Sequence, residues 1–105
     1  MEEVVLKYLP IFRENLLEAV SYIRETLQNP IAANNLVDDV EEAILTRSKI
    51  PESFEQYNSL KERKYPYYRI YVKNFVIYYV VIPSKPKIME IRRFLSIQRN
   101  REFIV

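Results

Sequence analysis

The spacing of the apolar residues changes once along the chain, close to Tyr67. Before that point, apolar side chains recur every three or four positions between Pro10 and Leu27 and again between Pro30 and Ile50, which is typical of amphipathic helices. After it they alternate in 68–72 and fill nearly every position of 75–82. Alternation indicates a strand with one covered face, and the apolar run indicates a central strand covered on both faces.

Proline and asparagine mark where the two helices begin and end. Pro10 and Pro30 suit the first position of a helix, where the missing N–H costs nothing, and Asn29 is a favourable N-cap. Pro51 ends the second helix because it pushes Ile50 out of the helical region. A link this short predicts an antiparallel helical hairpin.

Four segments are predicted to be strands, with a loop over residues 51–66 and a tight turn in which Asn74 takes the left-handed conformation. The strands cover residues 3–9, 68–72, 75–82 and 87–95. The element order is β-α-α-β-β-β, so we expect an α+β fold with the helical hairpin packed on one face of a mainly antiparallel sheet of about four strands. Without an internal linker or repeat, the 105 residues are expected to form a single domain, 1–105.

The chain contains no cysteine, no histidine and no glycine. This composition excludes disulfides, Cys- or His-ligated metal, Ser-His-Asp arrangements and glycine-rich phosphate loops. What remains is binding, or chemistry done by arginine, lysine, tyrosine and carboxylates. The acidic run Asp38, Asp39, Glu41 and Glu42 could hold Mg²⁺, but a solvated helix face is the favoured interpretation, and we expect no metal and no cofactor.

The first residues, Met1-Glu2-Glu3, are acidic where a secretory signal needs positive charge. The longest apolar run, Phe75 to Pro83, suits a buried strand and falls far short of the roughly 18 residues of a membrane span. We therefore expect a cytoplasmic protein with no membrane contact.

Charge is divided unevenly between the two halves of the chain. Residues 1–56 carry five Lys/Arg and eleven Asp/Glu, a net charge of −6, whereas residues 57–105 carry eleven Lys/Arg and three Asp/Glu, a net charge of +8. Such a split favours an anionic partner for the second half. An acidic helical surface beside a basic strand surface, with no role beyond solubility, explains it equally well.

Arginine and tyrosine interleave on the predicted strands of the basic half. Strand alternation places Arg69, Tyr71 and Lys73 on one face, which is the open face if the apolar residues between them meet the helices. Guanidinium groups pair with phosphates and tyrosine rings stack on unpaired bases, as RNA binding requires. Tyrosine and arginine that merely cover a sheet would show the same pattern. The candidate RNA-binding residues are Lys61, Arg63, Lys64, Tyr71, Lys73, Arg92, Arg93 and Arg101.

Metal-free cleavage of RNA needs a group that takes the 2′-OH proton, a cation for the phosphorane and an acid for the leaving oxygen. Arginine serves only the second role because it stays protonated. Proton transfer would fall to a tyrosine, a lysine or Glu90, and the sequence does not single one out.

Three stretches stand in a distinctive order. The first runs from Tyr22-Ile23 through Asn29-Pro30, Ala32-Ala33 and Leu36 to Glu41-Glu42-Ala43-Ile44. The second consists of Tyr68-Arg69-Ile70-Tyr71-Val72 and Phe75-Val76-Ile77-Tyr78-Tyr79, and the third is Arg93-Phe94-Leu95 followed by Arg99-Asn100. Their order and spacing resemble the RelE/ParE superfamily of bacterial type II toxins, over nearly the whole chain.

The resemblance implies a small toxin that a cognate antitoxin holds inactive by wrapping it. One branch of the superfamily cleaves mRNA in the ribosomal A site, and the other poisons DNA gyrase without the ribonuclease residues. Arg69 and Arg99 match basic positions of the family. The resemblance therefore implies catalytic roles for both, Arg69 holding the RNA backbone and Arg99 steadying the phosphorane.

The chain departs from the ribonuclease pattern at three places. Ser96 stands where a histidine is frequent, Val76 where an arginine is frequent, and residues 103–105 hold no tyrosine. The basic second half favours a toxin that inhibits translation by ribosome-dependent mRNA cleavage. The departures support two alternatives, a non-enzymatic gyrase inhibitor and a degenerate member that only binds its antitoxin.

Overall fold

The computed structural model describes residues 4–57 and 64–100. The strands are β1 (Val4–Tyr8), β2 (Gln56–Tyr57), β3 (Tyr67–Val72), β4 (Phe75–Ile82) and β5 (Lys87–Ser96). The helices are α1 (Pro10–Ser21), the π-helical turn η1 (Tyr22–Thr26), α2 (Pro30–Arg47) and the short α3 (Ile97–Asn100). The α+β class and the order of the long elements are as predicted. Within these residues, no helix is both long and apolar enough to cross a membrane.

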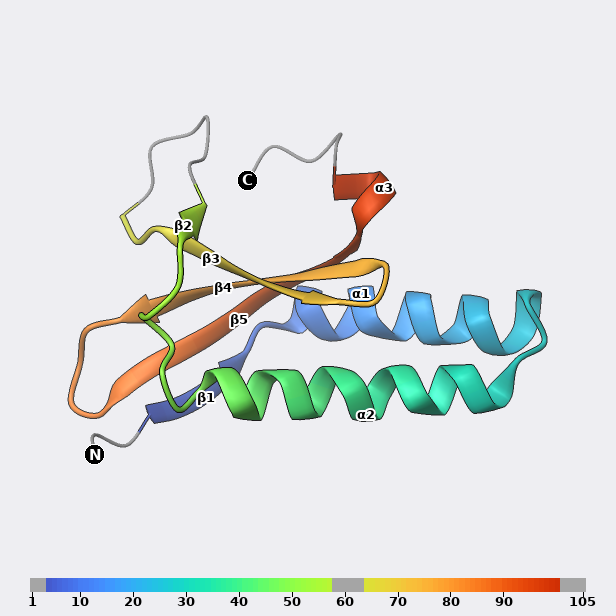
Figure 1. Ribbon diagram of the computed structural model, residues 1–105, viewed down its shortest axis with the longest axis horizontal. Coiled ribbons are helices and arrows are strands. Elements are labelled where there is room, and N and C mark those ends of the chain that lie inside the picture. Colours follow the sequence, from blue (N-terminus) through green and yellow to red (C-terminus); the bar gives the residue numbers. More distant parts are fainter. Residues whose placement is uncertain (1–3, 58–63, 101–105) are drawn as a thin grey trace.

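The strands form a five-stranded sheet in the order β1-β5-β4-β3-β2, with the helical hairpin against one face (Figure 1). β1 pairs with β5 in parallel, and the other three pairs are antiparallel. The fifth strand, β2, comes from the segment predicted to be a loop. It is only two residues long and pairs with Tyr67 and Tyr68, too short to show a pattern in the sequence.

The chain has no glycine, so other residues must take the positive φ angles that its turns require. In the described residues, Gln28 before α2 and Lys73 in the β3–β4 turn take positive φ, both at 52°. The prediction that Asn74 takes the left-handed conformation in that turn is wrong, since Lys73 does. The predicted N-cap is confirmed, because the Asn29 side chain accepts a hydrogen bond from the Ala32 N–H at 3.1 Å.

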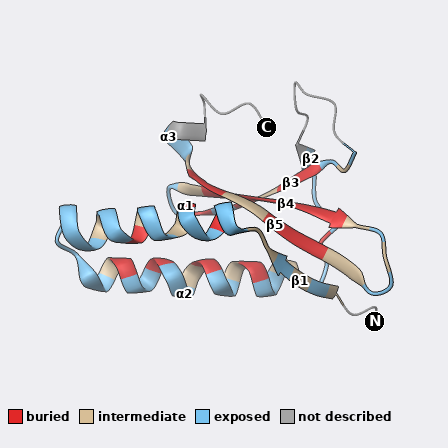
Figure 2. Cartoon of the chain, turned by 180° about the vertical axis from the view of Figure 1, so that it is seen from behind, coloured by how far each residue is buried: buried red, intermediate tan, exposed pale blue. Residues whose placement is uncertain are grey.

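Nearly every residue of β4, the third of the five strands, is buried (Figure 2). The larger core lies between the helices and the sheet and includes Leu36 and Ile44 of α2 and Ile77 of β4. A smaller cluster on the opposite face consists of Tyr67, Val76, Tyr78, Val80 and Leu95. The prediction of a central strand covered on both faces is confirmed, and the second cluster forms the floor of the face described next.

Candidate functional site

The face of the sheet opposite the helices carries arginine and tyrosine side chains and is termed here the arginine–tyrosine face. Tyr68, Ile70 and Val72 belong to the core under the helices, so the residues between them on β3 point the other way. The arginine–tyrosine face consists of Tyr67, Arg69 and Tyr71 of β3, Tyr78 of β4, and Glu90 and Arg92 of β5.

Two cation–ring contacts organise this face. The guanidinium carbon of Arg69 lies 5.8 Å from the ring centre of Tyr71, and Tyr71 is 59% exposed. The guanidinium carbon of Arg92 lies 5.7 Å from the ring centre of Tyr67, which packs edge-on against Tyr78. A cation at this range from an aromatic ring is attracted to it. The arrangement presents both a phosphate-binding group and an accessible ring that a base can stack on.

Glu90 is only 7% exposed, and two cations hold it. Its Oε1 accepts a hydrogen bond from Arg92 Nε at 2.8 Å, and its Oε2 lies 3.8 Å from Lys7 Nζ. Burial lowers the pKa of Arg92, but hydrogen bonds to Tyr67 and Glu90 outweigh that effect and raise it. Because its oxygens are already engaged, Glu90 serves as an anchor for Arg92 and is poorly placed to accept a proton from substrate.

A β-bulge separates the two adjacent arginines of β5. Tyr78 pairs with Arg93 and Tyr79 pairs with Ile91, so Arg92 is the extra residue. Arg92 reaches the arginine–tyrosine face, whereas Arg93 Nε donates a hydrogen bond to Asn15 Oδ1 of α1 at 3.0 Å. Sequence reasoning grouped both arginines on one surface, because the residues of the strand give no signal that indicates the bulge.

The other predicted binding residues lie apart from this cluster. Lys73 Nζ lies 3.0 Å from Asp39 Oδ2 of α2, so the expectation that Lys73 lines the open sheet face is wrong. β3 ends at Val72, and the positive φ of Lys73 breaks the alternation on which the expectation rested.

Lys64, another predicted RNA-binding residue, is exposed, with its Nζ 5.4 Å from the ring centre of Tyr65. Three other predicted residues, Lys61, Arg63 and Arg101, lie outside the residues that the structure describes. The backbone of Arg99 belongs to α3, but its side chain is not among the described parts.

The acidic run of α2 lies at exposed or half-exposed positions. Asp39 is paired with Lys73. Within the part of the chain that the structure describes, no three acidic side chains gather closely enough to hold a metal ion. This arrangement matches a solvated helix face.

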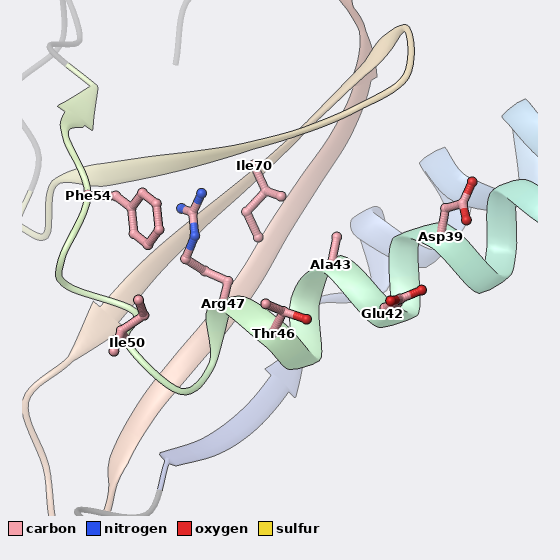
Figure 3. A pocket seen from close by; sticks show the side chains of 8 residues that line it. All are labelled: Asp39, Glu42, Ala43, Thr46, Arg47, Ile50, Phe54 and Ile70. Atoms are coloured by element: carbon pink, nitrogen blue, oxygen red, sulfur yellow. The ribbon is translucent and has the colours of Figure 1, made fainter.

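Sequence reasoning missed Arg47, which joins the end of α2 to the sheet (Figure 3). Its Nη1 donates hydrogen bonds to the backbone carbonyl of Arg69 at 2.9 Å and to the Tyr79 hydroxyl at 3.0 Å. Its guanidinium carbon lies 3.4 Å from the ring centre of Phe54. Arg47 and Phe54 border a pocket of about 380 Å³. The sequence showed only a basic residue in the last turn of a helix, which is a common feature.

The buried hydroxyl of Tyr79 is expected to make the fold sensitive to alkali. Its hydroxyl donates a hydrogen bond to the Pro51 carbonyl at 2.7 Å. Burial raises the pKa of Tyr79 above its usual value of 10.0, and Arg47 offsets part of the rise. A pKa that is higher in the folded state means that the stabilisation is complete below the unfolded pKa and is lost as pH rises through the folded pKa.

We therefore expect the free energy of unfolding to fall above about pH 10, and to fall less steeply in Tyr79→Phe. Urea titrations at a series of pH values measure both slopes. Tyr22→Phe, which alters an exposed ring, is the control and should keep the parent slope. Equal slopes for the parent and Tyr79→Phe would contradict the assignment.

A family model described as "ParE toxin of type II toxin-antitoxin system, parDE" matches residues 6–101. The matched range contains the helical hairpin, the strands β3 to β5 and both arginines predicted to be catalytic, Arg69 and Arg99. No curated protein matches the chain.

Proposed function

Because the chain belongs to the ParE toxin family of type II toxin–antitoxin systems, we propose that it arrests growth by cleaving mRNA on the ribosome. Family membership makes it the toxin of a pair and gives it an antitoxin partner. The observation that carries the proposed target is the contact of Arg69 with the exposed ring of Tyr71, on the same sheet face as Arg92.

The proposed roles follow from the chemistry of these side chains. The guanidinium of Arg69 binds a backbone phosphate and offsets the charge of the phosphorane, while the Tyr71 ring stacks on an unpaired base. Arg92, anchored by Glu90, supplies further positive charge to the same face. Arg99 is proposed as the second cation at the phosphorane on the strength of its match to the family.

Proton transfer is assigned to Tyr71. The rings of Tyr67 and Tyr78 are buried, and the Tyr79 hydroxyl is bonded to Pro51 on the helix side of the sheet. Glu90 is engaged by two cations. Tyr71, which is 59% exposed, therefore has the accessible hydroxyl among the tyrosines of the arginine–tyrosine face.

Inhibition of DNA gyrase without catalysis is the second candidate. It is favoured by the pairing of Glu90 with Arg92 and Lys7, which removes a carboxylate proton acceptor from the arginine–tyrosine face. In that case the arginines would contribute binding and no chemistry. A chain that only binds its antitoxin would cause no arrest at all.

The deciding experiment is to induce the chain alone in bacterial cells and to pulse-label protein and DNA synthesis in parallel. An early fall in methionine incorporation is the expected result. An early fall in thymidine incorporation with protein synthesis intact would contradict the ribonuclease proposal and support inhibition of DNA gyrase. Growth without arrest would support the alternative in which the chain only binds its antitoxin.

A further inference from the structure

Lys7 of β1 lies on the same sheet face as the arginines, although it belongs to the acidic half of the sequence. Leu6 and Tyr8 pack against the core under the helices, so Lys7 between them points the other way. Lys7 is the partner of Glu90 where β1 pairs with β5 (Figure 1), and Glu90 is the partner of Val80, which belongs to the second cluster. Lys7 therefore lies at the β1 end of the arginine–tyrosine face.

Both cations that hold Glu90 are open to a ligand. The Lys7 side chain is 61% exposed, and its Nζ lies 3.8 Å from Glu90 Oε2, which is too long for a hydrogen bond. In the part of the chain that the structure describes, the Lys7 ammonium therefore keeps all three N–H donors. The Arg92 side chain is 26% exposed. Its guanidinium has five N–H donors, so some are left after the hydrogen bonds to Glu90 and Tyr67.

Glu90 holds these two cations in place before any ligand arrives. Its buried carboxylate accepts a hydrogen bond from Arg92 on one oxygen and faces Lys7 with the other. The three side chains together carry a net charge of +1, so the cluster still attracts an anion. Side chains that are already positioned lose less conformational entropy when they bind a ligand. The arrangement suits a phosphate group, which accepts hydrogen bonds from ammonium and guanidinium alike.

We propose that Lys7 and Arg92 form a second phosphate-binding site, and that a single strand of RNA crosses the sheet from Arg69 on β3 to Lys7 on β1. These strands are three strand spacings apart, about 14 Å, so Arg69 and Lys7 contact different phosphates. Arg92 lies between them because the β-bulge places it beside Tyr78, the partner of Arg69. Phosphate contacts position a strand without reading its bases. The choice of RNA rests on the proposed function.

The test measures how strongly salt weakens the binding of single-stranded RNA to the full chain. The RNA is a mixed-sequence strand of about 12 nucleotides with 2′-O-methyl groups, which have no 2′-OH proton to remove and so prevent cleavage. Fluorescence anisotropy gives the dissociation constant from about 50 to 200 mM salt. Each phosphate contact on a single strand contributes about 0.7 to the slope of log K against log salt concentration. Lys7→Gln should therefore lower the slope by about 0.7, so that the parent loses about 2.6-fold more affinity over this range.

Two control variants separate charge from other roles of the side chain. Lys7→Arg keeps the positive charge and should keep the parent slope, which a role of Lys7 in packing does not require. Lys49→Gln removes an exposed cation just after α2 and should also keep the parent slope. Arg69→Ala should lower the slope by about 0.7, as Lys7→Gln does, because each variant removes one phosphate contact.

A parent slope in Lys7→Gln, or an equal loss of slope in Lys7→Arg, would overturn the second phosphate-binding site. If Arg69→Ala alone lowers the slope, the ribonuclease proposal stands and the second site falls. If Lys7→Gln lowers the slope while pulse labelling shows arrested DNA synthesis, the phosphate-binding site stands and the mRNA substrate falls. The absence of saturable RNA binding by the parent chain would overturn both.

Discussion

Replacing Arg69 with alanine is expected to abolish growth arrest and to slow mRNA cleavage by at least about 100-fold. Removing one preorganised donor from a site that stabilises developing negative charge costs about 10² to 10³ in rate. The hydrogen bond that joins α2 to β3 is retained in this variant, because Arg47 bonds to the backbone carbonyl of Arg69 and not to its side chain. Arg69→Ala should therefore still unfold cooperatively and bind the antitoxin.

Primer extension on cellular mRNA after induction, beside growth curves, measures this effect. Arg99→Ala should behave in the same way if both arginines act on the phosphorane. Lys85→Ala, which removes an exposed cation from the β4–β5 turn, is the matched control and should stay fully toxic. Arg69→Lys should recover only part of the activity, since an ammonium cannot bind phosphate through two parallel hydrogen bonds. If Arg69→Ala and Arg99→Ala both arrest growth as fast as the parent chain, the ribonuclease proposal is wrong.

Arg47→Ala is expected to lower the free energy of unfolding by about 3 kcal/mol. The side chain provides two hydrogen bonds from a charged donor, which contribute about 1.5–3 kcal/mol each as an upper range, and a cation–ring contact with Phe54. Its loss leaves the Arg69 carbonyl without this donor and opens the pocket beside Phe54 to water. The end of α2 and the segment after it should loosen together.

Urea denaturation of the purified chain measures the change. Arg24→Ala is the control, because Arg24 is exposed and makes one long contact, 3.4 Å to Asn34 Oδ1, so its loss should change stability by no more than about 0.5 kcal/mol. The loss of stability in Arg47→Lys should lie between the losses in Arg47→Ala and Arg24→Ala, since a single ammonium cannot reach both acceptors and the ring in the same geometry. A loss below about 1 kcal/mol for Arg47→Ala would show that packing, and not this side chain, holds α2 to β3.

The helical hairpin was predictable because each of its features depends on near neighbours in the chain. Pro10, Asn29 and Pro30 act within one turn of the helix ends, and the apolar stripe of α2 repeats at helical spacing. The same holds for β4, whose continuous apolar run places it in the middle of the sheet.

The candidate site was only partly predictable. Alternation along β3 was enough to put Arg69 and Tyr71 opposite the helices, because the strand is regular up to Val72. It failed for Lys73, where the turn begins, and for the Arg92–Arg93 pair, where one inserted residue changes which neighbours each arginine meets.

The α+β class, the helical hairpin, the central strand and the face on which Arg69 and Tyr71 lie could all be predicted from the amino-acid sequence. Three features became visible only in the folded chain: β1 joins β5 in parallel, Arg47 bonds to Tyr79 across 32 positions, and Asn15 bonds to Arg93 across 78. The physical reason is the range of the interactions. Periodicity and capping act between residues a few positions apart, whereas bulges, buried hydrogen bonds and pockets form only when distant segments pack together.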